Sequence, residues 1–281
     1  MSSIRPFEIG VCSWSLQVKS VSELKQLTGR LGLDIVQIAC GDPHHASWDE
    51  GDAMPAAAKA SGLRLSAAML GFPGEDYTTP ATIQKTGGFG DPALRPERLR
   101  RLAWGLDRTV QMGLSAITLH GGFIPEPGDP DRTPFLDTLA KAGDMARAAG
   151  VTLALETGQE TADLLRRTLD DLRHPSVKVN FDPANMILYD MGDPIRAVGI
   201  LGPDIHSVHV KDAVRTKVPG TWGEEVPLGK GQVGIAAFLK ALRDAGYAGP
   251  LAIEREVGNQ EQRFADIAHG VTVLREALAS T

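Results

Sequence analysis

The sequence predicts an α/β fold, a closed (β/α)8 barrel, and three observations favour it. Short apolar runs alternate eight times with longer amphipathic stretches along the 281 residues, as strands and helices do in a parallel barrel. The turn from a helix to the next strand is short, as in "AAGVTLAL". A glycine also separates a helical stretch from the next apolar run, where a left-handed helix cap is favoured, at Gly32, Gly62, Gly113, Gly150 and Gly246.

Each apolar run is bounded by turn residues, which is typical of a buried parallel strand. The expected strands are 8–13, 35–39, 63–68, 116–119, 152–155, 177–181, 207–210 and 251–253. The stretches that follow them repeat apolar residues at helical spacing. The expected helices are 22–31, 54–60, 96–112, 134–149, 161–172, 194–200, 235–245 and 262–279.

A doubly wound open sheet is the second fold that this alternation allows. That fold would favour a glycine-rich phosphate turn after an early strand. The turn "GVCSWSL" holds one glycine and no GxGxxG pattern, so the barrel is preferred and a dinucleotide site is disfavoured. We expect one barrel domain over residues 1–281.

Composition excludes several classes of protein. The formal net charge of −6 argues against a nucleic-acid binder that works through a basic face. No apolar run is long enough for a membrane span, and the start of the chain shows no secretory signal. Two cysteines, Cys12 and Cys40, make no disulfide framework. A cytoplasmic protein is therefore expected.

Ionisable residues collect at the ends of the last five expected strands. His120 ends the fourth strand, Glu156 the fifth and Asp182 the sixth; His209, Lys211 and Asp212 lie at the seventh, and Glu254 ends the eighth. Barrel enzymes form their sites at this face. Converging carboxylates repel one another unless a cation lies between them. Three carboxylates and an imidazole suit Mn²⁺ or Mg²⁺, and Co²⁺ or Zn²⁺ are also compatible.

Each of these residues has a simpler structural role open to it. A carboxylate after a strand can cap a helix, and His209 alone can be a structural histidine. His120 before Gly121 and Gly122 can serve a tight turn, and Lys211 with Asp212 can form an ion pair at the rim. The joint pattern of four metal-type ligands on successive strands favours a metal site.

Five segments carry a resemblance to a known family: "LALETG", "NFDPANM", "HSVHVKDA", "PLGKGQVG" and "LAIERE". They resemble the sugar phosphate isomerase/epimerase family, the xylose-isomerase-like TIM barrels. That family includes ketose 3-epimerases, hydroxypyruvate isomerase and inosose dehydratase, and more distantly endonuclease IV. The resemblance covers nearly the whole chain and is densest from residue 153 to 256.

The resemblance implies one divalent metal ion, Mn²⁺ above all, held by Glu156, Asp182, His209 and Glu254. In ketose 3-epimerases the two glutamates also act as the acid and base on opposite faces of the sugar. Asn185 stands where those epimerases have a substrate-binding histidine, a difference that argues against a free ketohexose. The family often forms dimers or tetramers, so both a homodimer and a homotetramer stay open.

Arg215 falls where the epimerases hold a substrate-contacting arginine. Lys211 and His120 are candidates to orient substrate hydroxyls, and Trp14 is a candidate platform for a sugar ring. Lys211, Arg215 and Lys217 could accept an anion or face solvent, so a phosphate on the substrate is left open. The long loop 70–94 is expected to be a lid in which Phe72, Tyr77 or Phe89 covers a sugar, or else a surface excursion.

The chemistry expected at such a site begins with removal of the proton next to a carbonyl. A metal that stabilises the ene-diolate lowers the cost of this step. Return of the proton to the opposite face gives epimerisation, return to the neighbouring carbon gives isomerisation, and loss of a β-substituent gives elimination.

We therefore expect a metal-dependent sugar isomerase or epimerase with a small sugar or polyol substrate, and no nucleic-acid or membrane partner. A lyase or dehydratase of the same family is the alternative, of the inosose-dehydratase type or one acting on 3-keto-glycosides. An endonuclease IV-like repair enzyme and a non-catalytic metal-binding barrel are remote alternatives.

Overall fold

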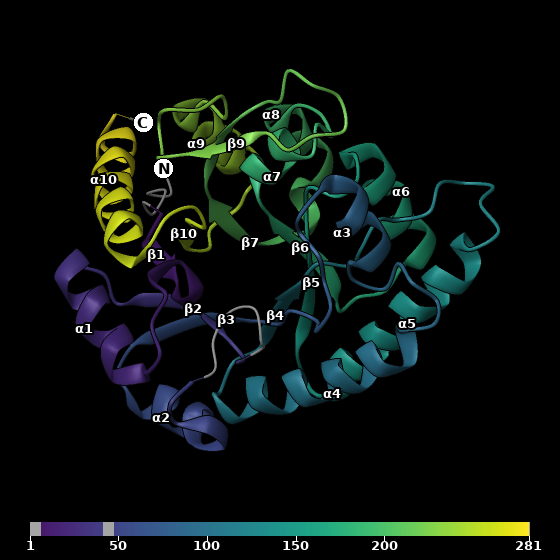
Figure 1. Ribbon diagram of the computed structural model, residues 1–281, viewed down its shortest axis with the longest axis horizontal. Coiled ribbons are helices and arrows are strands. Elements are labelled where there is room, and N and C mark those ends of the chain that lie inside the picture. The colour runs from purple at the N-terminus through teal and green to yellow at the C-terminus, as the bar shows by residue number, and fades with distance from the viewer. Residues whose placement is uncertain (1–6, 42–47, 281) are drawn as a thin grey trace.

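The computed structural model describes residues 7–41 and 48–280. Eight parallel strands close a barrel in the order β1-β10-β7-β6-β5-β4-β3-β2, which confirms the predicted fold class. Figure 1 shows these strands at the centre of the molecule, with helices around them. The barrel strands are β1 Ile9–Cys12, β2 Ile35–Ala39, β3 Arg64–Met69, β4 Ala116–Leu119, β5 Thr152–Glu156, β6 Val177–Phe181, β7 Ile205–Val210 and β10 Leu251–Ile253.

All eight expected helices are present and begin and end within three residues of the expected bounds. They are α1 Val21–Leu31, α2 Met54–Ala60, α4 Arg95–Gln111, α5 Arg132–Ala148, α6 Ala162–Leu172, α8 Pro194–Leu201, α9 Ile235–Asp244 and α10 Gln260–Ala279. The five glycines expected at helix ends have φ between 66° and 81°, a conformation that costs other residues free energy. Among the described helices, we find no stretch both long and apolar enough to cross a membrane.

Two short helices and two short strands, which the sequence pattern did not predict, lie in the connections at the carboxyl ends of the barrel strands. Helix α3, Pro80–Thr86, lies within the loop 70–94, and α7, Pro183–Leu188, follows β6 directly. An antiparallel pair, β8 Asp212–Val214 and β9 Glu224–Val226, fills the connection after β7. These elements are too short for periodicity to reveal, although Thr79 caps α3 with both hydrogen bonds of a capping box.

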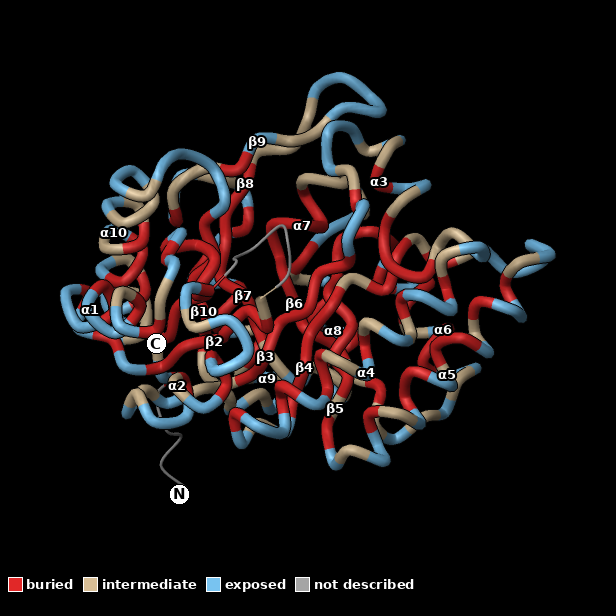
Figure 2. The backbone as a smooth tube through the Cα atoms, turned by 60° about the horizontal axis from the view of Figure 1, so that its bottom comes forward, coloured by how far each residue is buried: buried red, intermediate tan, exposed pale blue. Residues whose placement is uncertain are grey.

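The core lies between the barrel and the helices, as Figure 2 shows by the buried strands and the exposed outer turns. Phe181 on β6 stacks on Phe238 of α9 with ring centroids 5.8 Å apart. Phe72 and Phe89 in the loop 70–94 are fully buried and contact each other edge to face. The expectation that these two phenylalanines cover a sugar is therefore wrong, because they are core residues that anchor the loop.

Polar side chains inside the barrel bond to one another beneath the face where the candidate site lies. Gln37 of β2 donates from Nε2 to Thr118 Oγ1 of β4 at 2.9 Å. Ser207 of β7 donates to Asn180 Oδ1 of β6 at 2.6 Å. Gln37, Thr118 and Asn180 are fully buried. These hydrogen bonds therefore fix the side chains that lie directly beneath the candidate site.

Candidate metal centre and active site

Four side chains from consecutive barrel strands converge at the carboxyl face. Glu156 ends β5, Asp182 follows β6, His209 lies on β7 and Glu254 follows β10. One ligand atom from each lies within 4.8 Å of the others, and all four residues are buried. Because parallel strands of a closed barrel end at one face, residues 98 positions apart in the chain meet here. The structure thus brings together the four residues predicted as metal ligands.

The imidazole of His209 directs Nδ1 toward the carboxylates. Nδ1 lies 3.2 Å from Glu156 Oε1, 3.6 Å from Glu254 Oε2 and 3.8 Å from Asp182 Oδ2. Burial acts to lower the pKa of His209, but the surrounding negative charges hold that pKa well above its usual value. The cluster therefore favours a positive charge at its centre.

Gln37 orients this histidine from below, and sequence reasoning missed it. The Nε2 atom of His209 lies 2.9 Å from Gln37 Oε1. A carboxamide oxygen only accepts, so Nε2 carries a hydrogen and Nδ1 faces the cluster. The available signal was a glutamine inside the otherwise apolar strand "IVQIA".

Asp182 performs two tasks with its two carboxylate oxygens. Oδ1 accepts hydrogen bonds from the backbone N–H groups of Ala184 and Asn185, at 2.7 and 3.0 Å, and so caps α7. Oδ2 is buried and has no hydrogen-bond partner among the described residues. A buried carboxylate oxygen without a partner is costly, and a cation would satisfy it. The donor set of this cluster therefore fits a divalent metal ion.

Glu254 is held by two donors that the sequence analysis had nominated for other roles. Trp14 donates from Nε1 to Oε1 at 2.7 Å, and Lys211 donates to Oε2 at 2.8 Å. Burial raises the pKa of Glu254 to about 8 against the opposing charge of Lys211. Trp14 therefore contacts the carboxyl group itself as well as lining the space above it.

Glu156 has the opposite environment. Asn185 donates from Nδ2 to Oε1 at 3.0 Å, and His120 Nε2 lies 3.7 Å from Oε2. Burial acts to raise the pKa of Glu156, but the positive charges of His120 and His209 outweigh burial and hold the pKa well below its usual range. Two carboxyl groups whose pKa values are driven apart can serve as acid and base at the same pH.

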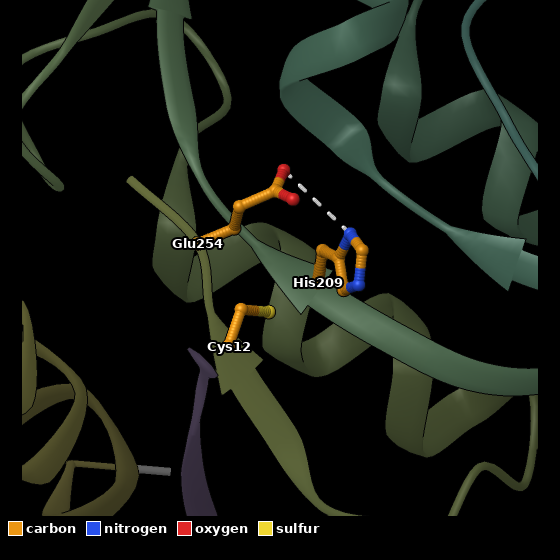
Figure 3. Close-up of side chains that lie close together, drawn as sticks. All are labelled: Cys12, His209 and Glu254. Atoms are coloured by element: carbon orange, nitrogen blue, oxygen red, sulfur yellow. Dashed lines mark ion pairs between the residues drawn. The ribbon is translucent and has the colours of Figure 1, made fainter. Parts of the chain in front are cut away.

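Cys12 lies beside the cluster, which was not foreseen. Its thiol belongs with His209 and Glu254 to a second group of close ligand-type atoms, and Figure 3 shows the three side chains around one space. Burial raises the pKa of the Cys12 thiol to about 12. The sulfur therefore stays a neutral thiol, which is a weak metal ligand.

A cavity of about 820 Å³ opens above the cluster. Its walls include both glutamates and four of the five predicted substrate contacts, Trp14, His120, Asn185 and Lys211. Three aromatic side chains, Tyr77, Tyr189 and Trp222, also line it. A volume of this size is ample for a small-molecule substrate.

The loop 70–94 and the β8–β9 connection meet at this cavity. Trp222 donates from Nε1 to the carbonyl oxygen of Thr78 at 3.3 Å. Tyr77 packs on His120 with ring centroids 6.1 Å apart. Tyr77 is thus the one of the three proposed lid aromatics that lines the cavity.

Two basic residues after β7, Arg215 and Lys217, do not line the cavity. Arg215 pairs with Asp190 and donates to the carbonyl oxygen of Gly192 at 2.9 Å, and it does not line the cavity. Lys217 is exposed. Lys211 pairs with Glu254 and Glu256 rather than with Asp212, so the structural alternative of a rim ion pair with Asp212 is wrong.

Comparison with known proteins now assigns the family. Residues 26–277 match the family described as Xylose isomerase-like TIM barrel, and the chain belongs to this family. It is similar to the L-ribulose-5-phosphate 3-epimerase of Salmonella typhimurium, with 29% identity over 199 residues, or 69% of this chain and 68% of that protein.

Solved structures agree with this assignment. A xylose isomerase domain protein from Planctomyces limnophilus is 34% identical, with a TM-score of 0.85 over 99% of this chain and 100% of that chain. A structure of L-ribulose 3-epimerase, 20% identical, has a TM-score of 0.73 over 98% of this chain and 95% of the other. The predicted family is confirmed, and the similar Salmonella epimerase supports the expected class of enzyme, a carbohydrate isomerase or epimerase.

Proposed function

We propose that the protein is a divalent-metal-dependent sugar isomerase or epimerase in which Glu156 and Glu254 exchange protons with the substrate. One observation carries the proposal: both carboxyl groups line one cavity, and their environments drive their pKa values in opposite directions. At neutral pH one group can accept a proton while the other donates one.

The metal ion would be held by Glu156, Asp182, His209 and Glu254. Mn²⁺ is the first choice for three carboxylates and an imidazole, and Mg²⁺ shares the same preference for oxygen ligands. When bound, such an ion supplies electrostatic stabilisation for negative charge that develops on substrate oxygens.

The chain's own side chains would position the two proton carriers. Trp14 and Lys211 fix the carboxyl group of Glu254, so that its proton is held at a defined place. Asn185 holds Glu156 in the same way. One glutamate would remove the proton next to the substrate carbonyl, and the other would return a proton to the opposite face. Holding both groups in place before the substrate arrives lowers the cost of each transfer.

Isotope exchange tests this proposal directly. The Mn²⁺-loaded protein is incubated with free and phosphorylated 2-ketoses in D₂O, and deuterium at the carbon next to the carbonyl is measured by mass spectrometry and NMR. We expect exchange with at least one ketose, and a product of unchanged mass apart from deuterium. Loss of water or of a substituent would instead identify the lyase alternative.

Two variants test the assigned residues. Glu156→Gln and Glu254→Gln should each slow exchange by about 100-fold or more, because each removes one proton carrier. Glu224→Gln is the matched control, since Glu224 is exposed on β9 and does not line the cavity. Metal content is measured in parallel, and a Glu254→Gln protein that retains both metal and full exchange contradicts the proposal. The cytoplasmic location and the oligomeric state stay predictions.

A further inference from the structure

We propose that this site takes an uncharged sugar and discriminates against its phosphate ester. The inference rests on the proposed function and names the substrate class of the same cavity. The inferred substrate differs from that of the similar Salmonella enzyme, whose name specifies a phosphorylated ketose.

The charged residues in the cavity wall are mostly acidic. The described lining includes five glutamates against two lysines and one arginine; they are Glu75, Glu156, Glu225, Glu254, Glu256, Lys19, Lys211 and Arg263. A phosphate group needs cations or free N–H donors that are directed toward it. The proposed metal ion would compensate Glu156 and Glu254, so recognition of a phosphate away from the metal depends on whether one of the three cations is available.

Two of those cations are already used within the wall. Lys211 is buried and donates to Glu254 at 2.8 Å and to Glu256 at 2.5 Å. Arg263 directs its donors to the backbone carbonyl oxygens of Gly258, Trp14 and Glu256. The side chain of Lys19 is left at the exposed edge of the cavity. A lone exposed lysine holds an anion only weakly.

One of the loops that often bind phosphate in barrel enzymes, the loop after β7, also has its backbone donors occupied. Barrel enzymes often bind phosphate with backbone N–H groups of the loops after the seventh and eighth strands. In this chain, the loop after β7 directs the N–H groups of Gly229, Gly231 and Val233 to the buried carboxylate of Asp212, at 2.9, 2.9 and 3.1 Å. These three donors, which lie outside the cavity lining, are therefore not available to an anion.

The fit around that carboxylate leaves no room for a second anion. A Cβ added at Gly231 would lie 2.2 Å from Asp212 Oδ1 and 2.6 Å from the backbone nitrogen of Ala213. Asp212 also accepts from the N–H of Ala213 at 3.0 Å. This loop is a closed structural unit, and it is not an open anion site.

The remaining walls suit an uncharged molecule. Tyr77, Tyr189 and Trp222 line the cavity, and Trp222 packs edge to face on Tyr189 at 4.7 Å. Aromatic faces bind apolar surface such as the C–H face of a sugar ring. Glutamates and Asn185 can bond to hydroxyl groups, which accept as well as donate.

The first experiment compares matched substrates. Deuterium exchange from D₂O is measured for L-ribulose against L-ribulose 5-phosphate, and for D-fructose against D-fructose 6-phosphate, each with the Mn²⁺-loaded enzyme. We expect kcat/KM for the faster free sugar to exceed that of its ester by about tenfold or more, the value of one charged contact. A faster ester overturns this inference and leaves the proposed function standing.

If none of the four sugars exchanges, the proposed function is not supported for these ketoses, and a separate measurement tests the discrimination against phosphate by itself. Inorganic phosphate is titrated by calorimetry into protein stripped of metal with EDTA. The absence of binding at millimolar phosphate supports the inference, because no anion seat exists. Saturable binding overturns it.

A charge variant tests the part assigned to Lys211. Glu256→Gln removes one of the four carboxylates that lie within 4 Å of this lysine, so the preference for the free sugar should fall by roughly threefold. Glu224→Gln removes the same charge from β9 outside the cavity and should leave the ratio unchanged. Because the ratio is taken within one protein, a common loss of activity cancels. An unchanged ratio in Glu256→Gln contradicts the role given to Lys211.

Discussion

At the scale of single residues, this protein concentrates ionisable groups where burial controls their protonation. Glu156 and Glu254 have the same chemistry and meet at one site, but their neighbours drive their pKa values apart. Burial raises the pKa of Glu254 against the charge of Lys211, whereas the charges of His120 and His209 outweigh burial and lower the pKa of Glu156, and these partners come from distant parts of the chain. Proximity in sequence predicted neither set.

Glu160 provides a residue-scale prediction outside the metal cluster. Burial raises its pKa from 4.5 to about 8, so the folded protein keeps this proton to higher pH than the unfolded chain. The contribution of Glu160 to the free energy of unfolding is therefore fully present below pH 4.5. It is lost as the pH rises toward 8, by on the order of 4 kcal/mol. Glu160→Gln should reduce this loss, as measured by urea unfolding at several pH values in EDTA.

The control for this experiment is Glu276→Gln, because Glu276 is exposed on α10. It should follow the wild-type pH dependence. If Glu160→Gln and wild type lose stability in parallel between pH 5 and pH 8, the raised pKa is refuted.

At the scale of elements, the barrel units follow from the sequence pattern, but the insertions that complete the site do not. Helix α7 has six residues, too few to show a period, but it carries Asn185 to the carboxylate of Glu156. The β8–β9 pair brings Trp222 to the cavity wall from an exposed connection. Such short elements form because the barrel end and a single capping residue support them.

Asp212 provides the prediction at this scale. It is buried and accepts four backbone N–H groups of the loop after β7. Asp212→Ala would leave these donors without a partner, and we expect a loss of about 3 kcal/mol in the free energy of unfolding. Urea titration followed by circular dichroism measures it.

The matched variant is Asp137→Ala, on the exposed face of α5. It should change stability by less than about 0.5 kcal/mol. Equal stabilities for the two variants would show that Asp212 does not hold this loop together.

At the scale of the whole molecule, a metal ion would join four strands and so couple binding to global stability. Mn²⁺ at about 100 times its Kd should stabilise the folded protein by about 2.7 kcal/mol, seen as a rise in Tm by calorimetry. Asp182→Asn keeps an oxygen that can accept the N–H groups at the start of α7, but it removes a charged metal ligand. This variant should therefore lose most of the Mn²⁺-dependent rise in Tm.

Asp193→Asn serves as the control, because Asp193 caps α8 in the same manner through Ile195 and Arg196. Asp193 is exposed and belongs to neither group of close ligand-type atoms among the described residues. It should keep the full Mn²⁺-dependent rise in Tm. A full rise in Asp182→Asn would remove Asp182 from the set of proposed ligands.

The eight strands and eight helices could be predicted because each depends on local patterning and on glycine at helix ends. The four cluster residues could be found for a related reason: they all follow strands, and parallel strands of a closed barrel end at one face. Arg215 shows the limit of this reasoning. It follows β7, as expected, but its side chain pairs with Asp190 and does not line the cavity. Phe72 and Phe89 show the same limit, because an apolar residue in a loop can belong to the hydrophobic core instead of a binding site.

By itself, the sequence determined the barrel, the order of its units and the face at which Glu156, Asp182, His209 and Glu254 would gather. Those features follow from the period of the apolar residues, from the spacing of the strands along the chain and from the shared direction of the strands. The local sequence encodes all three. Only the tertiary structure decided which oxygen of Asp182 is left without a partner, which nitrogen of His209 faces the cluster, and which cations of the wall are already paired. These properties depend on contacts between residues far apart in the sequence and on the solvent that those contacts exclude.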